Sequence, residues 1–180
     1  MARLARALDT ADLPYIIIGG QAVLVYGEPR LTRDVDVTLG SDPARLGDVL
    51  GVCAGLGLVP LIDPAPFVAE TLVLPCEDPA TGLRVDFIFS YEGYERAAVA
   101  RAATRRLGGT DVRFASAEDL VVLKVVAGRP RDLEDVAGVL ARQPTLDAGY
   151  VRGWLAAFEE AVERPLVEVF EQALREAGRA

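Results

Sequence analysis

Two aspartates spaced two residues apart are the first side chains whose types and spacing suggest chemistry. Asp34 and Asp36 lie in residues 32–39, where apolar and polar residues alternate. That alternation predicts a strand with one apolar and one acidic face. Two ionised carboxylates on one face repel each other, and a divalent cation turns the repulsion into shared coordination. The pair therefore predicts a site for Mg²⁺, with Mn²⁺ as the alternative ion, and metal-assisted phosphoryl or nucleotidyl transfer.

A third aspartate, Asp86, interrupts the apolar residues 83–90, which predict another strand. Alternation places Asp86 on the face opposite the core-facing side chains. An isolated carboxylate in an otherwise apolar strand is costly to bury without a cation or another partner. If this strand lies beside the one carrying Asp34 and Asp36, Asp86 reaches the same metal ions.

The composition narrows the chemistry further. The 180-residue sequence contains no histidine, which excludes Ser–His–Asp and Cys–His nucleophilic sites and His-ligated zinc. The net charge of −8 disfavours broad nonspecific binding to nucleic acid, and the local cluster of Arg101, Arg105 and Arg106 is more typical of a solvated face. Cys53 and Cys76 are far apart in sequence and are predicted to be buried thiols in a reducing cytosol.

A glycine pair precedes the acidic strand. Residues 15–18 form a continuous apolar, β-branched run that predicts a buried strand ending at Gly19 and Gly20, and a short helix follows over 21–26. Glycines lack Cβ and let backbone N–H groups approach phosphates, and a helix N-terminus adds favourable polarity. We predict that Gly19, Gly20 and Arg33, which directly precedes the acidic pair, bind a nucleotide.

A lysine in an apolar helix is the next candidate. Lys124 is surrounded in sequence by valine and leucine, so its ammonium group must either extend to solvent or meet an anion. A nucleotide phosphate is the anion we predict, which gives Lys124 a catalytic and nucleotide-binding role. Asp132 and Asp135 either position Lys124 or Arg129 or form surface ion pairs. Arg129 and Asp132 complete the set of predicted nucleotide-binding residues.

The remaining pattern predicts an α+β protein. Helices are expected over residues 2–10, 44–56 and 94–103, and from 116 onward. A strand over residues 70–75 is expected to pair antiparallel with the strand that carries Asp86, and another short strand covers 111–115. The apolar run at 15–26 is too short to span a membrane, and the N-terminus is typical of a cytoplasmic protein.

Two stretches resemble known nucleotidyltransferases. The run IIIGGQAVLVYGEPRLTRDVDV resembles the signature of the polymerase-β nucleotidyltransferase superfamily: a hydrophobic strand, a glycine pair and then D-x-D. Residues 117–135 are similar to the E-D-L…K…A-G-R-x-K-D-x-x-D pattern of AbiEii-type nucleotidyltransferases, a group that includes toxins of bacterial toxin–antitoxin systems. Arg131 replaces the usual lysine, which keeps the charge but changes its hydrogen-bond geometry. The resemblance implies that Asp86 is the third carboxylate of the superfamily.

The resemblance also implies a fold and an activity. The expected fold is a nucleotidyltransferase-like mixed or antiparallel sheet with flanking helices over residues 1–115, followed by a helical subdomain over 116–180. The expected reaction moves a nucleoside monophosphate from an NTP to an acceptor with two Mg²⁺ ions. RNA, including tRNA, a protein hydroxyl and a small molecule such as an aminoglycoside all stand as acceptors, and a cognate antitoxin is the expected protein partner.

Two other functions compete with this one. A glycosyltransferase that uses nucleotide sugars also binds a divalent ion through D-x-D, but the short distance from the glycine pair to D-x-D and the small size of the chain argue against it. A catalytically silent nucleotidyltransferase-like fold could instead serve as a partner-binding or regulatory module. The presence of all three carboxylates argues against that function.

Overall fold

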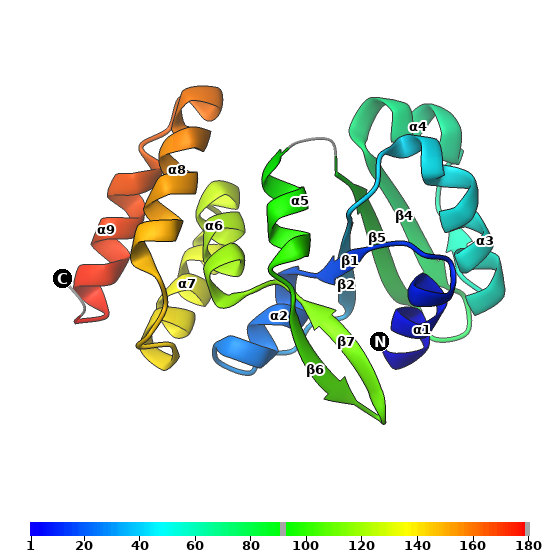
Figure 1. The fold of residues 1–180 in the computed structure, drawn as a ribbon, viewed down its shortest axis with the longest axis horizontal. Helices are drawn as coiled ribbons and strands as arrows, with labels where there is room; N and C mark the ends of the chain where they lie inside the picture. The colour runs from blue at the N-terminus through cyan, green and yellow to red at the C-terminus, as the bar shows by residue number, and fades with distance from the viewer. Residues whose placement is uncertain (91–92, 179–180) are drawn as a thin grey trace. The chain divides into compact units, whose positions relative to one another are not determined.

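The computed structural model describes residues 1–90 and 93–178, which form two compact units (Figure 1). Unit 1 contains Met1–Gln21 and Leu31–Ala115, and unit 2 contains Ala22–Arg30 and the chain from Ser116. Helix α2, Gly19–Tyr26, begins in unit 1 and ends in unit 2. Unit 1 carries the sheet, whereas unit 2 is helical.

Within the described residues, the sheet of unit 1 has seven strands in the order β3-β4-β5-β2-β1-β7-β6. Two neighbouring pairs, β2 with β5 and β1 with β7, are parallel, and the other neighbours are antiparallel. The α+β prediction with a mixed sheet is thereby confirmed, as is the predicted antiparallel pairing of β4 with β5. The strands are β1 Tyr15–Ile17, β2 Asp34–Leu39, β3 Val59–Pro60, β4 Val73–Asp78, β5 Leu83–Phe89, β6 Ala103–Leu107 and β7 Thr110–Phe114.

The core of unit 1 follows from alternation along its central strands. In β2, Val35, Val37 and Leu39 are buried, and in β5 every second side chain from Val85 to Phe89 is buried as well. Helix α1 buries its apolar stripe in unit 1, where it packs against α3 and β7. One face of β2 and β5 is therefore anchored in the core, which leaves the other face for polar side chains. The helices of unit 1 are α1 Ala2–Thr10, the 3₁₀ helix η1 Pro43–Arg45, α3 Leu46–Leu56, α4 Pro64–Thr71 and α5 Gly93–Ala100.

Unit 2 is a set of helices in which α6 contacts α7, α8 and α9. The Ser116 side chain accepts a hydrogen bond from the Asp119 backbone N–H at 3.1 Å and caps α6. Gly128 ends α6 in the left-handed region with φ of 65°, and Pro130 opens α7. No helix among the described residues is long and apolar enough to cross a membrane. The helices are α6 Ala117–Ala127, α7 Pro130–Arg142, α8 Ala148–Val162 and α9 Leu166–Glu176.

Two predicted boundaries are wrong. The strand expected over residues 70–75 begins only at Val73, because α4 continues to Thr71 and Leu72 then turns the chain with φ of 60°. The helix expected over residues 94–103 ends at Ala100. The next segment forms β6, an edge strand whose exposed arginines hide the apolar alternation that identifies a half-buried strand.

Candidate active site

The three predicted carboxylates lie on one face of two adjacent strands in unit 1. In the parallel pair β2–β5, Asp36 stands directly opposite Asp86, and Asp34 stands opposite Arg84. Asp34 is exposed, whereas Asp36 and Asp86 are half-buried. The two strands are neighbours, which is the arrangement that Asp86 needed to join the acidic pair. Among the described residues, no three acidic or cysteine side chains are already close enough together to hold a metal ion.

Gly19 is required by its contact with Asp36. The Ile18 N–H donates to the Asp36 carbonyl at 2.9 Å, and the chain then turns at Gly19 with φ of 60° to begin α2. A Cβ atom on Gly19 would lie 1.8 Å from Oδ2 of Asp36. Both the left-handed backbone and this close approach demand glycine. The first turn of α2, which also contains the buried Gly20, therefore starts beside a carboxylate, where its polarity is favourable.

The surroundings of Asp86 on the acidic face disfavour its charged form. Its Oδ1 atom is buried and has no hydrogen-bond partner among the described residues. Burial raises the pKa of Asp86, the Arg84 guanidinium opposes that rise, and the carboxylate of Asp34 adds to it. A buried oxygen without a donor beside two further carboxylates is a chemically suitable ligand for a hard divalent cation.

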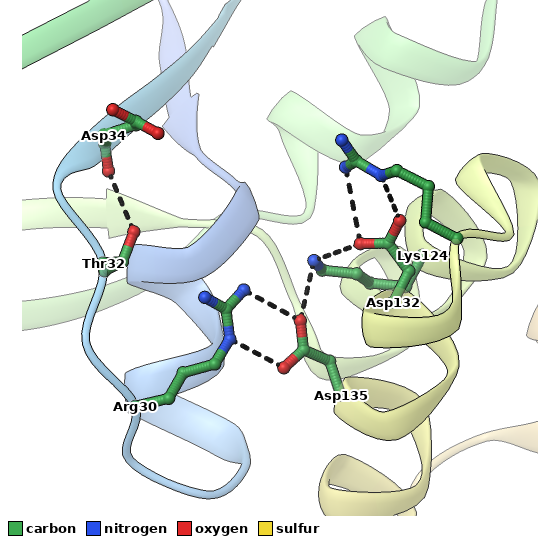
Figure 2. Close-up of polar contacts among 7 residues, drawn as sticks. Arg30, Thr32, Asp34, Lys124, Asp132 and Asp135 are labelled. Atoms are coloured by element: carbon green, nitrogen blue, oxygen red, sulfur yellow. Dashed lines mark hydrogen bonds and ion pairs between the residues drawn. The ribbon is translucent and has the colours of Figure 1, made fainter.

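The chain around Asp34 is held by hydrogen bonds to its backbone carbonyl. Gln21 donates through Nε2 and Thr32 donates through Oγ1, each at 3.4 Å. Figure 2 shows the hydrogen bond from Thr32. Sequence analysis did not identify either residue, since a side chain that bonds to the backbone leaves no periodic signal. Arg33, predicted to bind a nucleotide, is exposed directly before β2, and the described residues offer it no ion pair.

Lys124 lies in unit 2 and is only 7% exposed, so its ammonium group does not extend to solvent. Its Nζ atom lies 2.6 Å from Oδ1 of Asp132 and 2.8 Å from Oδ2 of Asp135 (Figure 2). Of the alternatives left open by the sequence, these two aspartates position Lys124 rather than form surface ion pairs. The anions that Lys124 meets in this structure are therefore carboxylates of its own chain.

Two arginines complete this cluster. Arg30 makes a two-point contact with Asp135 at 2.9 and 3.0 Å, and Nε of Arg129 lies 2.6 Å from Asp132 (Figure 2). Burial alone would raise the pKa of each aspartate, but the hydrogen bonds from these arginines and from Lys124 hold both pKa values below their ordinary range. Arg30 was not predicted, because it lies in the loop after α2 and follows no periodic pattern.

Comparison with solved structures shows the same fold at low sequence identity. The antibiotic-resistance factor ANT(2″)-Ia is 18% identical, with 89% of this chain and 90% of that chain covered and a TM-score of 0.58. An antigenic nucleotidyltransferase-like protein from Paracoccidioides brasiliensis is 15% identical, with 94% and 89% covered and a TM-score of 0.58. The lincosamide antibiotic adenylyltransferase LnuA is 13% identical, with 73% and 89% covered and a TM-score of 0.51.

The sequence itself identifies the family. No curated protein is significantly similar to this chain. Residues 2–179, however, match the family described as nucleotidyl transferase AbiEii toxin of type IV toxin–antitoxin systems. The match includes both stretches on which the predicted resemblance rests, the glycine pair with D-x-D and the segment around Lys124. The chain therefore belongs to the AbiEii family and is a nucleotidyltransferase.

Proposed function

We propose that this protein transfers a nucleoside monophosphate from an NTP to an acceptor hydroxyl with the help of Mg²⁺ bound at the acidic face. The acceptor oxygen forms a bond to the α-phosphorus, the bond from that phosphorus to the β-phosphate oxygen breaks, and pyrophosphate leaves. The observation that carries this proposal is the register of β2 and β5, which sets Asp36 opposite Asp86. One buried oxygen of Asp86 has no hydrogen-bond donor in the part of the chain that the structure describes.

Each carboxylate has a distinct task in this proposal. Asp34, Asp36 and Asp86 would hold the cations, which neutralise the charge on the phosphates and on the leaving group. Asp86 would also help to take the proton of the attacking hydroxyl, because its strand position places it on the same face as the other two carboxylates. The reaction consists mainly of positioning and charge neutralisation, so a chain without histidine can perform it.

Nucleotide binding is assigned to residues of both units. In unit 1, the backbone N–H groups at Gly19 and Gly20 and the exposed guanidinium of Arg33 would bind the triphosphate. In unit 2, the cluster around Lys124 joins three cationic side chains to two carboxylates. We propose that Arg129, whose side chain is 76% exposed, also contacts a phosphate while Asp132 and Lys124 hold it in place.

Transfer assays with labelled NTPs test this function. The protein is incubated with each of the four NTPs and with cellular RNA, cellular protein or an aminoglycoside, and both label transfer and pyrophosphate release are measured. Transfer should require Mg²⁺ and should be absent in Asp34→Ala. The exposed Asp63, which accepts no capping hydrogen bond at the start of α4, provides the control Asp63→Ala, which should retain activity. NTP binding without transfer to any of these acceptors would favour the silent, partner-binding module.

A protein partner follows from the family. Because the AbiEii family is described as the toxin of a two-component system, we propose that a cognate antitoxin restrains this activity. Co-expression with the protein encoded beside its gene should relieve growth inhibition caused by the active enzyme. The Asp34→Ala variant should not inhibit growth with or without that partner. Growth inhibition by the inactive variant would show that toxicity does not arise from transfer.

A further inference from the structure

Arg84 is the cation on the acidic face that the proposed reaction leaves without a task. It lies in β5 two residues before Asp86, so its side chain leaves the sheet on the same face. Its neighbours in register are Asp34 in β2 and Glu77 in β4. Although a carboxylate stands on either side, no described residue forms an ion pair or a hydrogen bond with the exposed Arg84 guanidinium.

The order of strands separates this arginine from the glycine turn. Gly19 adjoins Asp36 from the β1 side of β2, and the triphosphate is assigned to that turn. Arg84 and Asp86 lie on β5, which borders β2 on its other side. Asp86 is the residue assigned to the attacking hydroxyl. Arg84 therefore stands on the acceptor side of the acidic face and away from the glycine turn.

We propose that Arg84 binds an anionic phosphate group of the acceptor, next to the hydroxyl that attacks. This inference rests on the proposed nucleotidyl transfer and adds a chemical requirement for its second substrate. The planar guanidinium matches two phosphate oxygens and remains charged at any physiological pH. An acceptor that carries only ammonium groups offers the Arg84 guanidinium neither a hydrogen-bond acceptor nor an opposite charge. Arg84 thus selects phosphate-bearing acceptors over cationic ones.

The test compares acceptors that carry a charged phosphate group with acceptors that do not. The probes are a short RNA with a free 3′ hydroxyl, the same RNA with a neutral methylphosphonate as its last linkage, a nucleoside 5′-monophosphate and an aminoglycoside. The variants are Arg84→Gln and Arg84→Lys, and the matched control is Arg175→Gln, which changes an exposed arginine of α9. KM for each acceptor, kcat, and NTP affinity are measured for every protein.

The phosphate contact predicts a specific pattern. For RNA, Arg84→Gln should raise KM by about fivefold, the upper end expected for one solvent-exposed charged contact, and should leave NTP affinity unchanged. The salt dependence of RNA binding should lose about 0.7 from its slope, the value for one single-strand phosphate. The methylphosphonate should weaken binding to the wild type but not to Arg84→Gln. Arg84→Lys should recover part of the loss, and Arg175→Gln should behave as the wild type.

The source of the phosphate is read from the same experiment. Efficient use of the nucleoside monophosphate would identify a small phosphorylated acceptor, whereas use of the RNA alone would identify a strand end, and both results support the role of Arg84. Transfer to an aminoglycoside or a protein that is unaffected by Arg84→Gln would overturn that role and leave the proposed function standing. Equal losses of NTP and acceptor binding would overturn it as well. Absence of transfer and of pyrophosphate release with every probe would overturn both proposals.

Discussion

Replacing Asp86 with asparagine is expected to stabilise the metal-free protein while it abolishes transfer. The Oδ1 atom of Asp86 is buried without a hydrogen-bond partner among the described residues, and the charge of Asp34 adds to the strain. Asparagine keeps a polar atom at this position but removes the charge, so it relieves the cost of holding an ionised carboxylate there. Since Asp86 is only half-buried and solvent screens its charge, we expect a gain of about 1 kcal/mol. For a chain of this size that corresponds to about 2–4 °C in Tm.

The gain should depend on pH with a defined sign. The pKa of Asp86 in the folded protein is raised, chiefly by burial, above its value in the unfolded chain. Between these two pKa values the folded protein retains a proton that the unfolded chain has released, so wild-type stability falls as the pH rises. Below the unfolded pKa, wild type and Asp86→Asn should be equally stable. The difference in stability between the two proteins should grow as the pH rises from the unfolded pKa of Asp86 to its folded pKa, and it should persist at neutral pH.

Thermal unfolding followed by circular dichroism measures this difference. Wild type, Asp86→Asn and the exposed control Asp63→Asn are compared in EDTA from acidic to neutral pH, and then with Mg²⁺. Mg²⁺ should raise the Tm of the wild type more than that of Asp86→Asn, because the variant lacks one ligand. A variant less stable than wild type at neutral pH, or a difference that does not change with pH, would refute the reasoning.

Four further substitutions test the remaining parts of the site. Asp34→Ala or Asp36→Ala should abolish pyrophosphate release and leave the circular dichroism spectrum unchanged; turnover at the wild-type rate would remove that residue from the site. Gly19→Ala should weaken NTP binding, measured by calorimetry, because its Cβ would lie 1.8 Å from a carboxylate oxygen. Lys124→Met should lower the free energy of unfolding in urea by about 3 kcal/mol, since it leaves two buried carboxylates with one arginine partner each; unchanged stability with weaker NTP binding would instead assign this lysine to the nucleotide alone.

Sequence patterns identified the elements whose two faces differ most. β2 and β5 alternate apolar and polar residues because one face is in the core, and α1 carries an apolar stripe for the same reason. The sequence did not indicate α4, whose eight residues are too few for a clear helical period. It also failed to indicate β6, an edge strand that buries too little to require alternation.

The candidate site could be predicted as a set of residues but not as an arrangement. Alternation assigns Asp34 and Asp36 to one face, but only the strand order shows that Asp86 stands opposite Asp36. That order depends on a parallel pairing between strands separated in the chain by α3, α4 and two other strands, and no local pattern specifies it. The partners of Lys124 were likewise undetermined, because they depend on how α6 packs against α7.

The carboxylates of the two candidate clusters differ in whether cationic side chains compensate their charge. This difference indicates where an added cation is needed. In unit 2, each buried carboxylate receives hydrogen bonds from two cationic side chains, so the group around Lys124 is satisfied by the protein alone. In unit 1, burial and a neighbouring acid raise the pKa of Asp86, and one of its oxygens lacks a donor among the described residues. A sequence under no functional constraint could relieve that cost with one asparagine. The carboxylate that bears this cost lies on the acidic face, which is where a divalent cation would both stabilise the fold and supply the chemistry.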